Sequence, residues 1–195
     1  MHDKMTDLQI RFVPRSDISL ELDQKIDEID RLAFHSDSNE DNNDPSDAGD
    51  YEIRWQDIRW GPLEWMVLGY VDEELVTTLG LVHREILVGG KPLWVVGVGG
   101  VATLPVWQKC GFSTRLLQAA ETFMRENLPA DFGLLICGEE RIAFYGRVGW
   151  QHVADDLFFI QDGKRYPIVH IPVMILPLSK TDWTSGEIDL CGSPW

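Results

Sequence analysis

Apolar and polar residues follow two different periods in the first part of this chain. Residues 8–13 alternate at every second position, which predicts a strand with one buried face. Over residues 19–34 the apolar residues instead recur with helical spacing, which predicts an amphipathic helix. The predicted apolar face of this helix consists of Ile26, Ile29, Leu32 and Ala33.

Three longer apolar segments follow and predict an antiparallel meander. They occupy residues 64–71, 75–88 and 93–104, with short turns at 72–74 and 89–91. Short turns between consecutive strands favour antiparallel pairing. The last of these three segments, at 93–104, contains glycines inside its apolar run. They indicate either a bulge or a close approach to the backbone by a ligand. These glycines are Gly97, Gly99 and Gly100.

The second half of the chain alternates between helical and strand patterns. Residues 112–126 and 139–147 have helical patterns, and residues 132–137, 150–160 and 166–176 have strand patterns. A strand–helix–strand connection joins parallel strands, so the fourth and fifth strands of the chain, at 93–104 and 132–137, are predicted to be parallel. The predicted fold class is therefore mixed α/β (α+β), with a central, mostly antiparallel sheet of six to seven strands flanked by helices.

Two segments fall outside this pattern of a single domain over residues 1–195. Residues 36–50 are acidic and of low complexity, with too little apolar area to order themselves. They are predicted to form a mobile loop, with a substrate lid as the alternative. Residues 179–195 follow the last predicted strand and are predicted to be a C-terminal extension.

The net charge of −15 limits the classes of partner. It disfavours nucleic acid and anionic membranes, which attract basic surfaces. It suits a cationic small molecule, although acidity can also serve only solubility. Three widely spaced cysteines give neither a disulfide framework nor a metal site, and the first residues lack an apolar signal core. These features predict a cytoplasmic protein without a metal.

A glycine-containing turn after residue 104 is the most informative segment. The apolar run stops at Pro105, and the sequence from Gln108 to Ser113 then leads into a helical pattern. The first N–H groups of a helix lack internal partners and carry partial positive charge, so they can bind phosphate. Gly111 removes the Cβ that would keep a ligand away. The turn therefore predicts a phosphate-bearing cofactor.

The same turn resembles a signature of the GNAT superfamily of acyl-CoA-dependent N-acyltransferases. That signature is Gln or Arg, two residues, Gly, one residue, then Gly or Ala, and Ser113 stands at its last position here. A second GNAT-like segment covers residues 141–150, with Tyr145 before a Gly-aromatic pair. The resemblance extends over about residues 8 to 177 and implies the GNAT fold, with acetyl-CoA as acyl donor.

Within the superfamily the chain looks most like the aminoglycoside 2′-N-acetyltransferases and, more distantly, the nodulation N-acyltransferases. The similarity to the first group lies in the strand pair at 81–103 and in residues 182–187. Two departures are visible. The chain continues to Trp195, whereas those enzymes end two residues after the acid, and Gly99 replaces their substrate-facing glutamate.

The resemblance implies a coenzyme site made largely of backbone. The pyrophosphate would sit on N–H groups at residues 110–113, and the pantetheine arm would bind the backbone of residues 101–103. The N–H of Val101 would polarise the thioester carbonyl. The complete set is Val101, Ala102, Thr103, Gln108, Lys109, Cys110, Gly111, Phe112, Ser113 and Thr114, with Arg115 as a further contact.

The resemblance also suggests catalytic and acceptor residues. Tyr145 would protonate the leaving thiolate, the alternative being a ring that only packs. Candidates for the base are Glu85 and His83, then Glu139 and Glu140, and each of these has a solvated surface position as its alternative. The candidates for binding the acceptor are His83, Glu139, Trp183 and Glu187.

Two other residue types carry open alternatives. Cys137 could be a nucleophile in a ping-pong mechanism or a small core residue. The tryptophans could line a substrate cleft or belong to the core, and they are Trp55, Trp60 and Trp65.

The predicted reaction is direct transfer of an acetyl group to a primary amine within a ternary complex. The acceptor would be a cationic small molecule of the aminoglycoside or polyamine type. The alternatives are a longer acyl donor, a protein amine, or a non-catalytic module that binds acyl-CoA or a cationic drug. A homodimer is open, because the closing strands could pair at a sheet edge.

Overall fold

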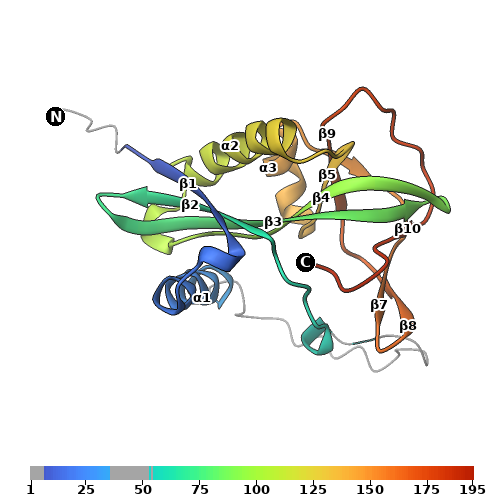
Figure 1. Cartoon of the computed structure of the whole chain (residues 1–195), viewed down its shortest axis with the longest axis horizontal. Coiled ribbons are helices and arrows are strands. Elements are labelled where there is room, and N and C mark those ends of the chain that lie inside the picture. The colour runs from blue at the N-terminus through green and yellow to red at the C-terminus, as the bar shows by residue number, and fades with distance from the viewer. Residues whose placement is uncertain (1–6, 36–52, 54) are drawn as a thin grey trace. The chain divides into compact units, whose positions relative to one another are not determined.

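The computed structural model describes residues 7–35, 53 and 55–195, which pack into two compact units (Figure 1). Strands β3 (Glu74–Val88) and β4 (Lys91–Thr103) contribute to both units, and the predicted loop at 36–50 lies outside the described residues. Of the described residues, the first unit comprises 7–35, 63–81 and 99–120, and the second comprises 53, 55–62, 82–98 and 121–195.

The first unit is an antiparallel sheet with a helix on each face. Strand β1 (Gln9–Pro14) pairs with β2 (Trp65–Val71), which pairs with β3. Helix α1 (Leu20–His35) covers one face, and α2 (Phe112–Asn127) begins on the other (Figure 1). Two short 3-10 turns complete the unit, at Arg15–Asp17 and Pro105–Trp107.

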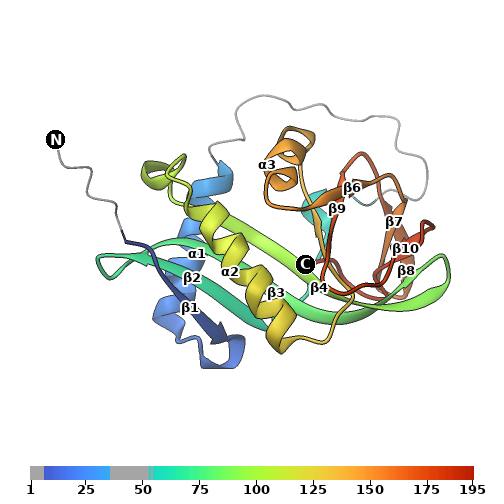
Figure 2. The same cartoon turned by 90° about the horizontal axis from the view of Figure 1, so that it is seen from above.

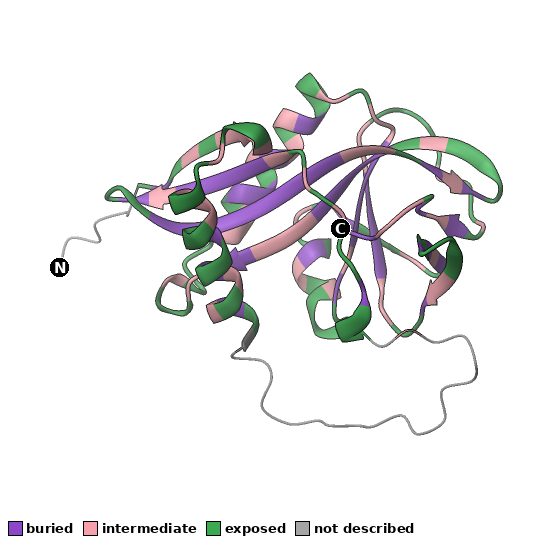
Figure 3. Cartoon of the chain, turned by 60° about the horizontal axis from the view of Figure 1, so that its bottom comes forward, coloured by how far each residue is buried: buried purple, intermediate pink, exposed green. Residues whose placement is uncertain are grey.

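Alternation along β2 assigns its side chains to these two helices. Met66 and Leu68 pack with the apolar face of α1, and Gly69 lies against α2, where an added Cβ would lie 3.5 Å from Leu116. The predicted apolar face of α1 is confirmed at three of its positions, because Ile26, Ile29 and Ala33 are buried. Buried positions continue along the central strands, as Figure 3 shows.

The second unit contains the larger part of the sheet. Hydrogen-bonded neighbours follow the order β6-β9-β5-β4-β3-β10-β7-β8. Val95 of β4 lies opposite Phe132 of β5 in a parallel pair, which confirms the predicted parallel pairing of strands 4 and 5. The remaining strands are β5 (Phe132–Ile136), β6 (Gln151–Val153), β7 (Leu157–Gln161), β8 (Lys164–Ile168), β9 (Val173–Pro177) and β10 (Ile188–Asp189). The helical elements are Trp55–Asp57, Glu139–Arg141 and α3 (Ile142–Gly146).

The sheet has ten strands among the described residues, more than the six to seven predicted. Each of the two predicted closing strands is divided in the structure, into β6 and β7 and into β8 and β9. Between β6 and β7, the carboxylate of Asp155 accepts hydrogen bonds from Trp183 Nε1 at 2.8 Å and from the Gly186 N–H at 2.9 Å. The chain thus leaves the ladder where Asp155 anchors the C-terminal segment.

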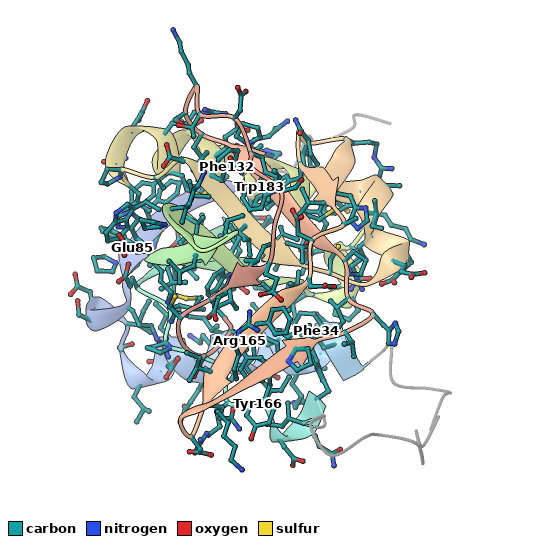
Figure 4. All side chains as sticks on the ribbon, turned by 90° about the vertical axis from the view of Figure 1, so that its right-hand side faces the viewer. Phe34, Glu85, Phe132, Arg165, Tyr166 and Trp183 are labelled. Carbon is teal, nitrogen blue, oxygen red and sulfur yellow. The ribbon has the colours of Figure 1, made fainter. Side chains whose placement is uncertain are left out.

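The segment at 179–195 is built into the second unit. Strand β10 inserts between β3 and β7, antiparallel to the first and parallel to the second. The ring of Trp183 meets Phe132 edge-on with centroids 5.1 Å apart, and the two side chains lie together in Figure 4. The ring of Trp195 occupies the space where a Cβ at Gly97 would lie. A side chain of this chain therefore makes the close backbone approach at Gly97.

Among the described residues, no helix combines the length and apolarity needed to span a membrane.

Candidate active site

The turn before α2 has the backbone geometry of an anion site. Lys109 and Gly111 both lie in the left-handed region, with φ of 63° and 79°. Left-handed residues within a turn direct successive N–H groups toward a common concavity. An added Cβ at Gly111 would meet nothing within 4 Å, and Gly111 O accepts the first helical hydrogen bond, from Arg115 N–H. The turn therefore has open space at Gly111 and the backbone conformation of an anion-binding nest.

Side chains around this turn divide between solvent and core. Phe112 is buried against Leu8, Val71 and Val76, so only its backbone can serve a ligand. The Arg115 guanidinium donates to Leu8 O at 3.2 Å and is thereby held toward the N-terminal strand. The exposed residues of the predicted set are Gln108, Lys109, Cys110 and Gly111, and Ser113 and Thr114 are half-buried.

The end of β4 presents peptide groups in two directions. Ala102 O accepts from Thr77 Oγ1 at 2.8 Å, and Leu104 N–H donates to Val76 O, so residues 102 and 104 face β3. Successive peptide groups of a strand alternate in direction. Val101 and Thr103 therefore direct their peptide groups to the opposite edge of β4. Gly100 precedes them with φ of 58°, the conformation of a bulge glycine.

A chain of three hydroxyl groups attaches α2 to the sheet. Thr77 Oγ1 lies 2.7 Å from Thr103 Oγ1, which lies 2.8 Å from Ser113 Oγ. Thr77 uses its only proton on the Ala102 carbonyl, so Thr103 must donate to Thr77 and Ser113 must donate to Thr103. The Ser113 hydroxyl proton is thus already used, and its side chain positions the turn without donating to a phosphate.

Replacing Thr77 with valine is expected to destabilise the protein by about 2 kcal/mol, because Thr77 is fully buried and its loss leaves the Ala102 carbonyl and the Thr103 proton unpaired. Ser113→Ala removes only the terminal donor and should cost less than about 1 kcal/mol. Denaturant unfolding of both variants measures the difference. Equal losses would show that the hydroxyl chain does not have this direction.

Tyr145 is placed on α3 with a buried ring and an available hydroxyl. Its ring lies edge-on to Phe144 and Trp150, with centroids 5.0 and 6.2 Å apart. Burial raises the pKa of Tyr145 above its usual value, and the neighbouring Cys137 adds to this. No other described residue hydrogen-bonds its hydroxyl. The phenol therefore keeps its proton at neutral pH and can offer it to a ligand.

The thiol of Cys137 lies just after β5, buried in the second unit. Burial raises its pKa to about 11, and Glu140 contributes in the same direction. Only the thiolate is an effective nucleophile. Cys137 is therefore protonated at neutral pH, which favours its interpretation as a small core residue.

The comparisons with known proteins agree with this geometry. The acetyltransferase (GNAT) domain family matches residues 22–153, more than half of the chain. The chain belongs to the GNAT family. It is thus an acyl-CoA-dependent N-acyltransferase, with acetyl-CoA as the acyl donor expected of this family. A comparison with curated protein sequences gave no match.

Solved structures share the GNAT fold at low sequence identity. Escherichia coli YhbS in complex with CoA has a TM-score of 0.60 and 16% identity, covering 94% of this chain and 89% of its own. A GNAT acetyltransferase from Brucella melitensis in complex with acetyl-CoA has a TM-score of 0.57 and 16% identity, covering 94% of this chain and 95% of its own. A putative N-acetyltransferase from Lactobacillus plantarum has a TM-score of 0.56 and 18% identity, covering 88% of this chain and 99% of its own.

The residues suggested as the catalytic base have different surroundings in the structure. Glu85 is exposed on β3 (Figure 4). His83 stacks on Trp94 with centroids 4.6 Å apart, and its Nε2 lies 2.9 Å from Pro129 O. Glu139 and Glu140 are exposed in the 3-10 turn before α3. None of these contacts identifies a base.

The other acceptor candidates take part in structural contacts. Trp183 donates to Asp155, as described, and the carboxylate of Glu187 lies 3.2 Å from Arg165 in a partly exposed ion pair. Trp55 and Trp60 are exposed and meet edge-on at 4.9 Å, so they do not belong to the core. No group of three or more His, Cys, Asp or Glu among the described residues could hold a metal ion.

Asp30 on α1 is a largely buried carboxyl beside β4 that the sequence reasoning did not single out. An ideal Cβ at Gly100 would lie 3.7 Å from Asp30 Oδ2, and Asp30 Oδ1 is buried without a hydrogen-bond partner. Burial raises the pKa of Asp30 to about 6, and the nearby Asp27 adds to the increase. One signal was available, because Asp30 is a charged residue one turn from Ile26 and directly after Ile29, at the border of the apolar face.

The raised pKa of Asp30 predicts a pH-dependent stability. The folded carboxyl binds its proton more tightly than the unfolded one, so its ionisation weakens the fold as the pH rises through about 6. Asp30→Asn is therefore expected to stabilise the protein by about 2 kcal/mol at pH 8 and to have almost no effect below about pH 4. Unfolding in denaturant at both pH values measures this. An equal effect at both would contradict the assigned pKa.

Proposed function

We propose that this GNAT enzyme transfers an acetyl group from acetyl-CoA to a primary amine of a cationic small molecule. The observation that carries the proposal is the turn at 108–113, where two left-handed residues and an open Gly111 precede the N-terminus of α2. Acetyl-CoA supplies a thioester whose carbonyl carbon is open to attack by an amine. The protein supplies binding, charge stabilisation and proton transfer.

Backbone groups of the first unit carry the binding role. The N–H groups at residues 110–113 would hold the pyrophosphate, favoured by the dipole of α2. Val101 directs its peptide group to the edge of β4 that does not pair with β3, and its N–H would stabilise negative charge on the carbonyl oxygen. The hydroxyl chain from Thr77 to Ser113 would keep these two parts in register.

The proposed reaction is a direct attack within a ternary complex. Cys137 remains a thiol at neutral pH, which disfavours an acetylated cysteine as intermediate. Tyr145 would give its proton to the departing sulfur, a role that matches a buried phenol without a partner among the described residues.

The charge of the chain supports a cationic acceptor. The sequence has 32 acidic and 17 basic residues, and acidic surfaces attract positively charged ligands. On α1, Asp30 adds negative charge next to Gly100, one residue after Gly99, which stands where aminoglycoside 2′-N-acetyltransferases have their strand acid. An aminoglycoside or a polyamine, each with several ammonium groups, fits this composition.

A panel of amines tests the acceptor class. Polyamines and aminoglycosides should have a kcat/KM at least about 100-fold above that of amino acids, whose carboxylate is repelled, and their rates should fall as salt is added. Release of the CoA thiol gives the rate. Amino acids acting as well as the polyamines would contradict the cationic acceptor. Tight acetyl-CoA binding without release by any amine would instead favour a binding module.

A further inference from the structure

We infer that Asp30 is the group that binds the ammonium of the acceptor beside Gly100 and removes its proton. The inference rests on the proposed acetyl transfer and names the base that this reaction requires. The contacts of the residues suggested by the sequence do not identify any of them as the base. These residues are His83, Glu85, Glu139 and Glu140.

Geometry places the carboxylate at the β4 bulge. Asp30 Oδ2 lies 3.7 Å from the position that a Cβ of Gly100 would occupy, and the next residue is Val101, whose N–H is assigned to the thioester carbonyl. A glycine at position 100 leaves this space without a side chain. The acid of the site thus comes from helix α1, while Gly99 and Gly100 keep the strand clear.

The local packing argues against a purely structural role for Asp30, because burial of its carboxylate destabilises the fold. Oδ1 is buried and unpaired, and the helix turns on either side are anchored by the buried Ile26 and Ala33. A buried carboxylate without a partner destabilises a protein. Polar groups retained at such a cost are concentrated at functional sites. An ammonium bound at Oδ2, the oxygen on the Gly100 side, would balance the charge of this carboxylate and offset the cost.

The charged groups around Asp30 favour proton uptake. Burial is the main cause of its raised pKa, and Asp27, one turn earlier on α1, is the charged residue that adds to it. The neighbouring Ile26, Ile29 and Ala33 of α1 belong to an apolar cluster whose members from β2, β3 and β4 are Met66, Leu68, Leu75 and Ala102. The carboxyl is therefore a stronger base than an exposed aspartate. It is still largely ionised at neutral pH, as a base must be.

The proposed step balances its protons and electrons. The ammonium transfers one proton to an Asp30 oxygen, and the freed nitrogen lone pair attacks the thioester carbonyl carbon. The C–N bond forms, the C–S bond breaks, and the sulfur leaves with the bonding pair and takes a proton from Tyr145. After the attack the nitrogen still carries a second excess proton, which it loses through solvent to the Tyr145 phenolate, so that a neutral amide and the Tyr145 phenol result. Asp30 releases its own proton to solvent, which restores the starting state.

Steady-state kinetics of Asp30→Asn test the inference, with Asp27→Asn as the matched control on the same helix. With spermidine as acceptor, Asp30→Asn should lower kcat/KM at pH 7 by about 100-fold and leave the acetyl-CoA dissociation constant within about twofold. The wild-type rate should rise with pH through a pKa near 6, and this acidic limb should be absent from Asp30→Asn. Asp27→Asn should keep activity within about threefold and shift the limb to lower pH, because it removes a like charge.

The two failures are distinguishable. If wild type and Asp30→Asn turn over equally and share the same pH profile, Asp30 is not the base, although the proposed function stands. If wild type binds acetyl-CoA but acetylates no amine, the proposed function fails and the role of Asp30 fails with it. Asp30→Asn is expected to remain folded, since it removes an unpaired buried charge.

Discussion

Replacing Gly111 with valine should weaken acetyl-CoA binding by at least about 100-fold, which corresponds to about 2.7 kcal/mol. Gly111 has φ of 79°, where a β-branched residue is strained, and its Cβ would enter the space assigned to the pyrophosphate. Calorimetric titration with acetyl-CoA measures the effect.

A matched variant separates strain from loss of the binding site. Gly163 in the β7–β8 turn has φ of 72°, and an added Cβ there would also meet nothing within 4 Å. Gly163→Val should lower stability to a similar extent while acetyl-CoA affinity stays within about threefold. Unchanged affinity in Gly111→Val, or equal losses in both variants, would remove the pyrophosphate from this turn.

Tyr145→Phe should lower kcat by about 100-fold while acetyl-CoA affinity stays within about threefold, because only the proton donor is lost. The phenylalanine ring retains the contacts with Phe144 and Trp150, so the fold should persist. Stopped-flow or steady-state thiol release gives kcat, and titration gives the affinity.

Tyr166→Phe is the control for this variant. Tyr166 lies on β8 and stacks on Phe159, with centroids 5.6 Å apart, and it has no proposed part in the reaction. Its replacement should leave kcat within about twofold of wild type, since it changes no proposed proton donor. A Tyr145→Phe enzyme as active as Tyr166→Phe would mean that another group, or water, protonates the sulfur.

Local pattern was sufficient to predict much of the fold. The two short turns predicted at 72–74 and 89–91 each contain two residues with positive φ, and the first pair is Asp72 and Glu73, with φ of 47° and 65°. Consecutive antiparallel strands and the parallel β4–β5 pair followed from connection length and from crossover geometry. These features depend on short segments of sequence.

Features that depend on distant residues were not predictable in this way. The division of the closing strands depends on Asp155. Its hydrogen-bond partners, Trp183 and Gly186, lie about 30 positions later in the chain, in the C-terminal segment just before β10. Strand β10 itself has only two residues, too few for a periodic pattern. Propensity along the chain cannot show which later residue completes a sheet.

The candidate site divides in the same way. The turn at 108–113 was visible because glycine and helix-start chemistry are local, and its backbone angles fit that interpretation. Asp30 lies 70 positions before Gly100 in the chain, and its importance follows from burial and from the missing partner of Oδ1. Similarly, the use of the Ser113 proton became apparent only from the hydroxyl chain that begins at Thr77.

The central claim is that this chain catalyses acetyl transfer from acetyl-CoA to an amine. The most direct measurement is simultaneous detection of CoA thiol and N-acetylated amine after incubation with acetyl-CoA and spermidine or an aminoglycoside. We expect the two products in equal amounts, formed over many turnovers and about 100-fold more slowly by Tyr145→Phe. Thiol release without an acetylated amine, or acetyl-CoA binding with no product from any acceptor, would contradict the account.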